Sequence, residues 1–319
     1  MAFPNFGPAP DIRLPMRTVD RPFPDGRLER PCMQTPLKDI VFEMRSLEPF
    51  PGVAARVMEL AGRPDVVPSD VSALVQTDAG ITSKVLKLCN SAYFGFQREI
   101  ASMHEAGNRL GVTTLVNLVM TSSAGKYFRD YGGASADALA RLWKRSVATA
   151  IMARLVAQKH RRCDPEQAYT AGLLQNIGSM VLERHMSDAR FAIRAVAKSG
   201  CTVIEAEKRT LGLHHAEIGA RLCTKWGLPE LLVDTIRYHH APEMATVNKL
   251  LAATSHLAEH LTDTLLAQEQ PAGPGQDPEL LYDLAPVALQ VTHVTERDFE
   301  GLQERLRSEL ERASEFLDG

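Results

Sequence analysis

The sequence predicts an all-α protein of two packed helical bundles. From residue 37 onward, apolar residues recur at helical spacing almost without a break. No segment alternates apolar and polar residues between hairpin turns, which is the pattern expected of strands. A glycine-containing break at residues 131–135 divides the helices into two groups. At 319 residues, the chain is long enough for about two units of ordinary domain size.

The composition is that of an ordinary globular protein. Hydrophobic residues make up 45% of the chain and charged residues 24%. A formal net charge of −3 gives no reason to expect nucleic acid or an anionic membrane as a partner. No apolar run approaches the roughly 18 residues that a membrane span requires. The five cysteines are scattered and form no CxxC pair, which favours reduced thiols in a cytoplasmic protein.

Residues 1–36 predict a flexible, proline-rich arm. They contain eight of the nineteen prolines, and proline at that density blocks both helices and central strands. The segment has no uninterrupted apolar core, so we expect no secretory leader in it. Phe3, Phe6 and Phe23 lie among the prolines and leave an alternative open, in which the arm docks on a folded surface.

Residues 37–130 predict the first bundle. Its first helix follows Pro51, and Ser69–Asp70 begins the second helix with residues that favour helix starts. Apolar residues at helical spacing from Ile81 onward predict a third helix. A longer helix is predicted for residues 110–128.

Residues 135–262 predict the second bundle. Within it, Asp164–Pro165 begins an apolar helix that we expect to continue to residue 182. One polar dipeptide, Gln175–Asn176, faces inward from this helix. Residues 278–319 predict a C-terminal extension that closes with a charged helix.

Three ordered motifs now point to a known family. The first is VLKLCNSAYFG at residues 85–95, and the second is AYTAGLLQNIG at residues 168–178. The third is HAEIGARLCTKWGLP at residues 215–229, which leads to IRYHH at residues 236–240. Together they resemble the HDOD family, the HD-related output domains of bacterial signalling proteins, over roughly residues 37–262.

The resemblance implies an all-helical fold of two bundles, of which the second is related to HD-type phosphohydrolases. It also implies a role in signal transduction, often near two-component or cyclic di-GMP systems and usually without demonstrated catalysis. We therefore expect signalling proteins of such pathways as partners. The chain shows no receiver, GGDEF or EAL segment, so we expect its input to come from a separate protein or through the termini.

The resemblance also implies where an HD-type hydrolase would hold its metal, namely through an early His, a His-Asp dipeptide and a late Asp. We place Arg145 at the early position, Gln175–Asn176 at the dipeptide and Glu259 at the late position. Two carboxamides supply no negative charge, and a guanidinium repels a cation. The guanidinium can instead fill the space of the cation and bond to Asn176 or Glu259. We therefore expect no metal, no cofactor and no catalytic residue, and we interpret the dipeptide as an internal hydrogen-bonding strut.

The role of three histidines, His215, His239 and His240, has two possible interpretations. In the favoured one they are buried core histidines: His215 braces a helix start, and the other two lie near a helix end, where the dipole favours an imidazolium. In the alternative they line a vestigial pocket that binds a small molecule or, weakly, a metal. The candidate residues of this pocket are Arg145, Gln175, Asn176, His215, His239, His240 and Glu259.

Four residues of the first motif, Asn90, Ser91, Tyr93 and Phe94, form the second candidate site. Asparagine and serine favour helix ends, where their side chains bond to free backbone groups. The favoured reading is a helix-terminating knot that anchors one bundle to the other. The alternative is a recognition surface for a partner or ligand.

These inferences predict a non-catalytic signal-transduction module that acts through protein–protein interaction, with gating by a ligand as one version. Two alternatives stay open. One is a divergent metal-dependent phosphohydrolase, such as a cyclic-dinucleotide phosphodiesterase, that uses His215, His239, His240 and Glu259. The other is a nucleotide sensor that binds without cleavage.

Overall fold

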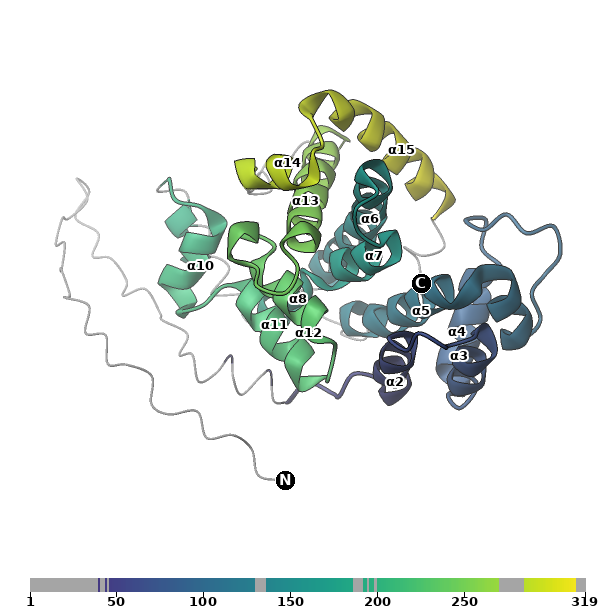
Figure 1. Ribbon diagram of the computed structural model, residues 1–319. Coiled ribbons are helices and arrows are strands. Elements are labelled where there is room, and N and C mark those ends of the chain that lie inside the picture. Colours follow the sequence, from purple (N-terminus) through teal and green to yellow (C-terminus); the bar gives the residue numbers. More distant parts are fainter. Residues whose placement is uncertain are drawn as a thin grey trace, which may run out of the picture. The chain divides into compact units, whose positions relative to one another are not determined.

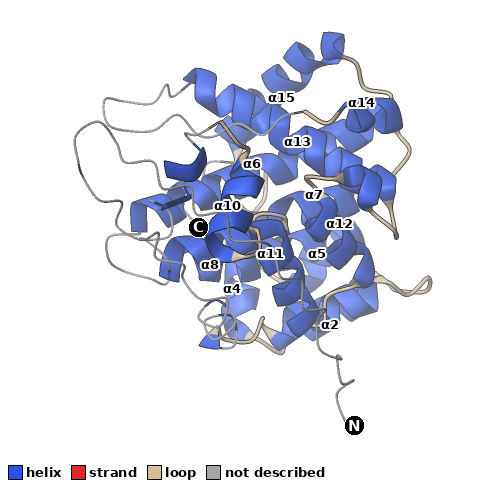
Figure 2. Cartoon of the chain, turned by 90° about the vertical axis from the view of Figure 1, so that its left-hand side faces the viewer, coloured by secondary structure: helices blue, strands red, loops and turns tan. Residues whose placement is uncertain are grey.

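The regular elements that the structure describes are all helices (Figure 1, Figure 2), and the all-α fold class is therefore confirmed. This computed structural model describes residues 40, 44, 46–129, 136–185, 192–193, 195–197, 200–269 and 284–313. The predicted arm at residues 1–36 and the predicted break at residues 131–135 lie outside the described residues. None of the described helices combines the length and the apolar character needed to cross a membrane.

The first bundle gathers around its longest helix. Its described helices are α2 (Gly52–Ala61), α3 (Pro68–Val75), α4 (Ala79–Cys89) and α5 (Met103–Arg129). The first three all pack against α5. Gly111 has a φ of 76° and interrupts α5 at the start of the helix predicted for residues 110–128, so a further helical segment that begins at Met103 precedes that helix. The Asp78 carboxylate accepts a hydrogen bond of 3.0 Å from the backbone N–H of Ile81 and thereby caps α4.

The second bundle surrounds one long helix, α6. Its described helices are α6 (Ala136–His160), α7 (Pro165–Leu174), α8 (Ile177–His185), α10 (Val203–Leu211), α11 (His215–Lys225), α12 (Glu230–Tyr238) and α13 (Lys249–Glu269). Helix α6 packs against both α7 and α13, and every residue from 146 to 153 is buried. Helix α11 packs against α8 and α12. A helix that is buried on all sides is typical of the centre of a bundle.

The predicted C-terminal extension covers part of the second bundle. It contains α14 (Pro286–Thr292) and α15 (Phe299–Arg312), and short 3-10 helices occur at η1 (Pro242–Met244) and η2 (Glu296–Asp298). Helix α14 packs on α13, and α15 packs on α6 and α13. Leu302 and Leu306 are buried in this contact, so the modest apolar face of the charged helix has a partner.

The helix predicted to continue through Gln175–Asn176 is interrupted there, which corrects the expectation. Helix α7 ends at Leu174 and α8 begins at Ile177. The backbone carbonyl of Asn176 accepts a hydrogen bond of 3.0 Å from the N–H of Ser179. Asparagine favours helix ends over helix interiors because its side chain competes for hydrogen bonds with the backbone. The dipeptide therefore lies in a turn between two helices, and both of its side chains are fully buried.

Aromatic stacking joins the two bundles in a common core. The Trp226 ring, after α11, lies 4.9 Å from the rings of both Phe50 and Tyr127, which belong to the first bundle. The Lys225 ammonium donates hydrogen bonds to the backbone carbonyls of Met44 at 2.9 Å and Leu47 at 3.3 Å. Aromatic pairs at these separations stabilise a contact beyond the area that they bury.

Two glycines bring α8 and α11 into backbone contact. A Cβ atom on Gly178 would lie 1.9 Å from the carbonyl oxygen of His215 and 2.6 Å from the backbone nitrogen of Gly219. No side chain fits in that space, so Gly178 is needed for the close approach. This contact places the first residue of α11, His215, beside the turn that carries Gln175–Asn176.

Replacing Gly178 by alanine tests this close approach. We expect Gly178→Ala to lower the free energy of unfolding by about 3 kcal/mol, because the added methyl group forces α8 and α11 apart. Urea unfolding followed by circular dichroism measures the change. Gly301→Ala is the matched control, since a Cβ at Gly301 in α15 meets nothing within 4 Å. The control should be neutral or stabilising by about 0.5–1 kcal/mol, and equal stabilities of the two variants would contradict the contact.

Candidate functional site

The structure brings most of the predicted pocket residues to one buried place in the second bundle. Arg145 comes from α6, Gln175 and Asn176 from the turn between α7 and α8, and Glu259 from α13. His215 is the first residue of α11, and His239 and His240 follow α12. Six of these residues are joined by direct side-chain contacts described below, with Gln175 as the exception.

Arg145 forms a buried ion-pair network with two carboxylates of α13. Its Nε donates a hydrogen bond of 2.6 Å to Oδ1 of Asp263, and Nη2 lies 2.5 Å from Oδ2 of the same residue. Nη2 also donates to Oε1 of Glu259 at 2.8 Å. The side chains are 12%, 4% and 2% exposed for Arg145, Asp263 and Glu259, so the solvent screens the network little. A forked contact of this kind holds the guanidinium in a fixed orientation.

Glu259 lies at the centre of this arrangement. Besides Arg145, the Asn176 amide donates a hydrogen bond of 2.9 Å to Oε1 of Glu259. Burial alone would raise the pKa of the Glu259 carboxyl, but the neighbouring Arg145 guanidinium opposes burial most strongly, and the pKa lies below its ordinary value. The carboxylate is therefore ionised, and its other oxygen, Oε2, has no hydrogen-bond partner among the described residues.

The three predicted histidines meet on the Oε2 side of Glu259. Nε2 of His215 and Nε2 of His240 are 3.0 Å apart. Nε2 of His239 lies 3.6 Å from Oε2 of Glu259, and Nε2 of His240 lies 3.7 Å from the same oxygen. One nitrogen from each of the three rings lies within 4.8 Å of the others.

Hydrogen bonds on the opposite side of two rings fix their orientation. Nδ1 of His215 lies 2.9 Å from Oε2 of Glu207, which also accepts a hydrogen bond of 2.8 Å from the backbone N–H of His215. Nδ1 of His239 lies 2.7 Å from the carbonyl oxygen of Ile236. Each of these contacts requires a proton on Nδ1, so Nε2 of a neutral ring carries the lone pair.

Burial acts differently on the three imidazoles. It lowers the pKa of His239 to about 3 and holds the pKa of His240 well below its ordinary value. Burial also acts to lower the pKa of His215, but the Glu207 carboxylate more than offsets it and the pKa is raised. The imidazolium expected at the helix end for His239 and His240 is therefore wrong, because desolvation of a buried charge exceeds the effect of the helix dipole.

The Gln175 side chain differs from that of its neighbour Asn176 in its hydrogen bonding. Neither its Oε1 nor its Nε2 has a hydrogen-bond partner among the described residues, although the side chain is fully buried. The interpretation of the dipeptide as a hydrogen-bonding strut holds for Asn176 and is wrong for Gln175. A buried amide without partners is costly, by about 1–3 kcal/mol, so this residue makes no structural contribution through its polar atoms.

Two carboxylates of the site, Asp263 and Glu207, were not predicted. Asp263 is four residues after Glu259 on α13, so both lie on the same helix face. An arginine that points inward needs a counter-charge, and this spacing was the available indication. Glu207 is separated from His215 by the helix end at Gly212, where φ is 82°, and no local pattern relates the two residues.

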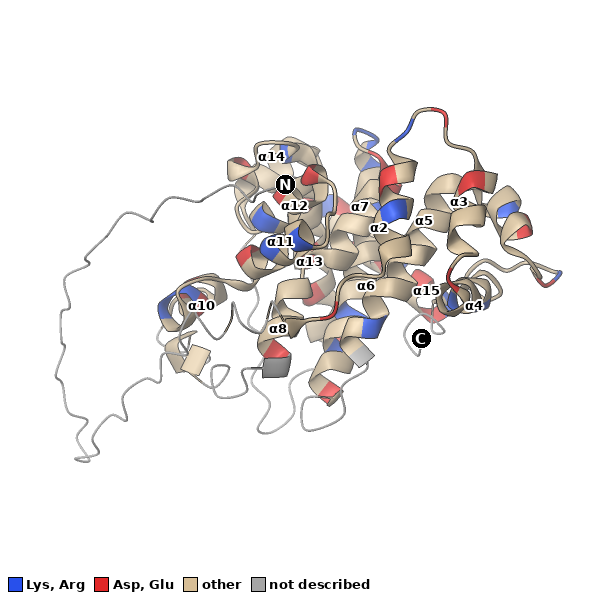
Figure 3. Ribbon diagram, turned by 90° about the horizontal axis from the view of Figure 1, so that it is seen from below, with Lys and Arg blue, Asp and Glu red and all other residues tan. Residues whose placement is uncertain are grey.

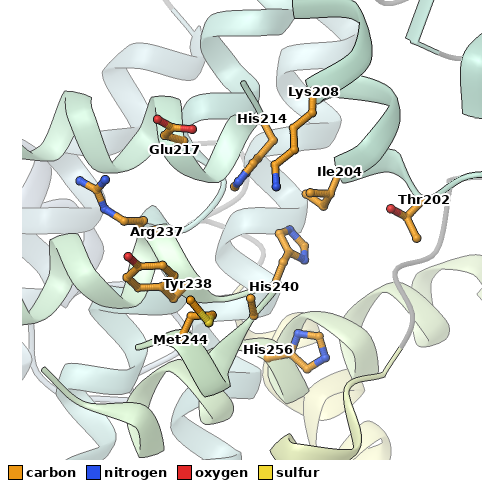
Figure 4. Close-up of a pocket in the computed structure, with 11 residues that line it drawn as sticks. Thr202, Ile204, Lys208, His214, Glu217, Arg237, Tyr238, His240, Met244 and His256 are labelled. Carbon is orange, nitrogen blue, oxygen red and sulfur yellow. The ribbon is translucent and has the colours of Figure 1, made fainter. Parts of the chain in front are cut away.

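A pocket of about 500 Å³ opens beside the histidines (Figure 4), and His240 forms part of its wall. In Figure 4 the side chains of Lys208 and His214 extend toward His240. The lining residues are Thr202, Ile204, Lys208, His214, Glu217, Arg237, Tyr238, His240, Ala241, Met244 and His256. The pocket thus combines two permanent cations with one acidic residue. Away from it, Figure 3 shows basic and acidic residues mixed along the helices.

The second candidate site makes contacts within the fold. The exposed Asn90 side chain bridges the loop after α4, donating to the Ile100 carbonyl at 2.9 Å and accepting from its N–H at 2.7 Å. The buried Ser91 hydroxyl donates to the carbonyl of Leu88 at 2.6 Å.

Tyr93 and Phe94, the aromatic pair of this motif, are half-buried and pack edge to face, with ring centres 5.1 Å apart. Arg154 of α6 donates a hydrogen bond to the Tyr93 hydroxyl and lies 5.5 Å above the Tyr93 ring. These contacts are of the kind that an anchor between the bundles requires.

The chain resembles a known protein family and a protein of known sequence. The model of the HDOD domain matches residues 47–242. An uncharacterised protein from Treponema pallidum (strain Nichols) is 30% identical over 240 residues, which is 71% of this chain and 45% of that protein. This chain therefore spans less than half the length of that relative.

Solved structures show the same fold. An HDOD domain protein of unknown function from Geobacter sulfurreducens has a TM-score of 0.63 at 22% identity, over 88% of this chain and 97% of the other. A protein from Shewanella amazonensis SB2B with a phosphohydrolase name has a TM-score of 0.65 at 25% identity, over 88% and 97%. A protein from Marinobacter aquaeolei VT8 named for signal transduction has a TM-score of 0.67 at 20% identity, over 89% and 66%. The predicted likeness to HD-type phosphohydrolases is confirmed for the fold.

The residues at the expected HD positions do not fit the metal of an HD-type hydrolase. Gln175 and Asn176 offer neutral amides in place of an imidazole and a carboxylate. The Arg145 guanidinium is bonded to the carboxylates of Glu259 and Asp263. A cation in the same place would compete with a permanent positive charge for both carboxylates.

The ion-pair network predicts a large effect of removing its cation. Arg145→Leu should lower the free energy of unfolding by about 3–5 kcal/mol, because it leaves the carboxylates of Glu259 and Asp263 buried without their cation. Denaturant unfolding at neutral pH measures the change. Arg221→Leu is the matched control, since Arg221 pairs with Glu217 at 2.6 Å but its side chain is 46% exposed. The control should cost no more than about 1 kcal/mol, and a similarly small cost for Arg145→Leu would contradict the network.

Proposed function

Because the chain belongs to the HDOD family, we propose that it is a non-catalytic module of signal transduction that acts by binding a partner protein. The partner class that fits the family is a signalling protein of a two-component or cyclic di-GMP pathway. A ligand in the pocket beside His240 would provide a means to gate this binding. The packed core and the altered HD positions together support the proposal.

One observation carries the non-catalytic assignment, namely the bonding of Arg145 to Glu259 and Asp263. Metal-dependent hydrolysis requires a cation that binds water and lowers its pKa toward neutrality. A guanidinium pairs with the carboxylates but offers no open coordination position, and it keeps its proton at neutral pH. This pairing supports a site at Arg145 without the means to generate a nucleophile.

Restoring the HD dipeptide alone tests this assignment. We expect Gln175→His with Asn176→Asp to bind no more zinc or manganese than the unmodified chain, because Arg145 still repels a cation. A triple variant that adds Arg145→His should bind more than the double variant. Elemental analysis after dialysis measures the uptake.

Two outcomes would contradict the non-catalytic assignment. Additional metal in the double variant would show that Arg145 does not exclude the cation. Hydrolysis of cyclic di-GMP or another phosphoester by the unmodified chain, at a rate lost on Gln175→Ala, would support the divergent phosphohydrolase instead.

A ligand sensor is the second candidate function, and the pocket of about 500 Å³ favours it. Lys208 and Arg237 place two cations on a wall that also holds His214 and His240. A volume and a charge of this kind suit an anionic small molecule such as a nucleotide.

Calorimetric titration with cyclic dinucleotides and nucleoside triphosphates tests the sensor. We expect micromolar binding by one of them, weakened about tenfold or more by Lys208→Ala, because a hydrogen bond to a charged group contributes about 1.5–3 kcal/mol. Lys84→Ala, on the exposed face of α4, is the control and should bind as the unmodified chain does. No heat with any of these ligands would remove the nucleotide sensor.

A further inference from the structure

We infer that His215, His239, His240 and Glu259 form a binding site for one transition-metal cation of the zinc type. The site lies on the Oε2 side of Glu259 and uses neither residue of the Gln175–Asn176 dipeptide. It has no hydrolytic role and ties together the start of α11, the end of α12 and the middle of α13. The inference stands apart from the proposed function, because metal uptake is measured without any substrate or partner.

The distances fit a tetrahedral ion. Zinc binds imidazole nitrogen and carboxylate oxygen at about 2.0–2.1 Å, so ligand atoms at the corners of a tetrahedron are roughly 3.4 Å apart. The nitrogens of His215 and His240 are 3.0 Å apart, and Oε2 of Glu259 lies 3.6 and 3.7 Å from His239 and His240. Displacements of a few tenths of an ångström would bring these edges to the ideal length.

Two buried polar atoms of the site have nothing to bond with. Nε2 of His239 and Oε2 of Glu259 lack hydrogen-bond partners among the described residues. His239 is fully buried and Glu259 is 1% exposed. Buried polar atoms of this kind are rare and energetically costly. A single cation between them would satisfy both atoms at once.

The supporting hydrogen bonds are those that a ligating histidine requires. In metal sites the ring nitrogen away from the ion is held by a carboxylate or a backbone carbonyl, which fixes the tautomer and the ring plane. Here Glu207 holds Nδ1 of His215 and the Ile236 carbonyl holds Nδ1 of His239. Both Nε2 atoms are therefore directed toward the proposed ion. Glu207 thus acts as a positioning residue for His215.

The local charge calls for a divalent cation. Among the described residues, the carboxylates of Glu259 and Asp263 pair with the guanidinium of Arg145, and the Glu207 carboxylate contacts His215. In the proposed site the imidazoles are neutral ligands, so the ion supplies positive charge beside the carboxylates of Glu207 and Glu259. Arg145 bonds to Oε1 of Glu259, and the proposed ion would bind Oε2, so both cations can share the carboxylate.

The donor set selects the ion. Three imidazoles and one carboxylate favour Zn²⁺, Co²⁺, Ni²⁺ or Cu²⁺ over Mg²⁺ and Ca²⁺, which prefer oxygen ligands. The pocket wall at His240 gives the ion a route from the solvent, and Figure 4 shows this ring beside the open volume. The bound ion would hold that wall in one conformation.

The experiment uses the full chain stripped with a chelator and then dialysed against Zn²⁺ or Co²⁺. We expect one ion per chain by elemental analysis, together with the visible absorption of tetrahedral Co²⁺. We also expect a rise in Tm on the order of 5 °C at a zinc concentration about a hundred times Kd. His239→Gln should abolish metal uptake. If this variant does not fold, His240→Gln, which alters the ligand at the pocket wall, should abolish metal uptake instead. Gln175→Ala should leave uptake unchanged.

His160→Gln is the matched control, because His160 bonds to Thr254 and to the backbone of Arg162 instead of to the site. It should retain one ion per chain. The inference is overturned if the unmodified chain binds less than about a tenth of an equivalent, or if the folded His239 and His240 variants bind as much as it does. Phosphoester hydrolysis by the chain would contradict the proposed function and leave this site in place.

Discussion

The buried carboxylate of Glu259 is the constraint on which the polar centre of this protein depends. A charge at 1% exposure in a helical core is tolerated only when each of its oxygens is compensated. Arg145 and Asn176 compensate one oxygen, and the imidazoles of His239 and His240 face the other. The site therefore has two halves. The guanidinium occupies the half at Oε1 of Glu259, and the histidines line the half at Oε2.

The backbone positions both halves through two close contacts. Helix α13 carries Glu259 and Asp263 one turn apart, and its packing against α6 places both beside Arg145. On the other side, the approach of α8 to α11 at Gly178 fixes where α11 begins, and His215 is its first residue. The polar contacts thus depend on apolar packing, since the helices fix the positions from which these side chains extend.

Much of this arrangement could be predicted from the sequence. The rest could not be predicted, for physical reasons. The helical periodicity predicted the all-α fold, and three local motifs predicted the family. Arg145, Asn176 and Glu259 were placed together through the resemblance, and they do meet. Periodicity could not show that the helix breaks at Gln175–Asn176, because a turn between two helices with a common apolar face preserves the pattern. Asp263 was missed although its spacing from Glu259 indicated a shared helix face, and Glu207 was missed because tertiary packing sets its partner, which local spacing does not encode.

The two halves of the site differ in what they offer to a cation or a ligand. Under the proposed function, the guanidinium takes the place of a cation and offers none of the open coordination that metal-dependent hydrolysis needs. The histidine half faces a pocket that contains Lys208 and Arg237, so ions or anionic ligands that enter there reach His240 before the half that the guanidinium occupies. His240 follows α12, and η1 and α13 come next along the chain. Binding there would therefore act on the conformation of this segment, which is the property that a signalling module requires and that a catalytic site does not.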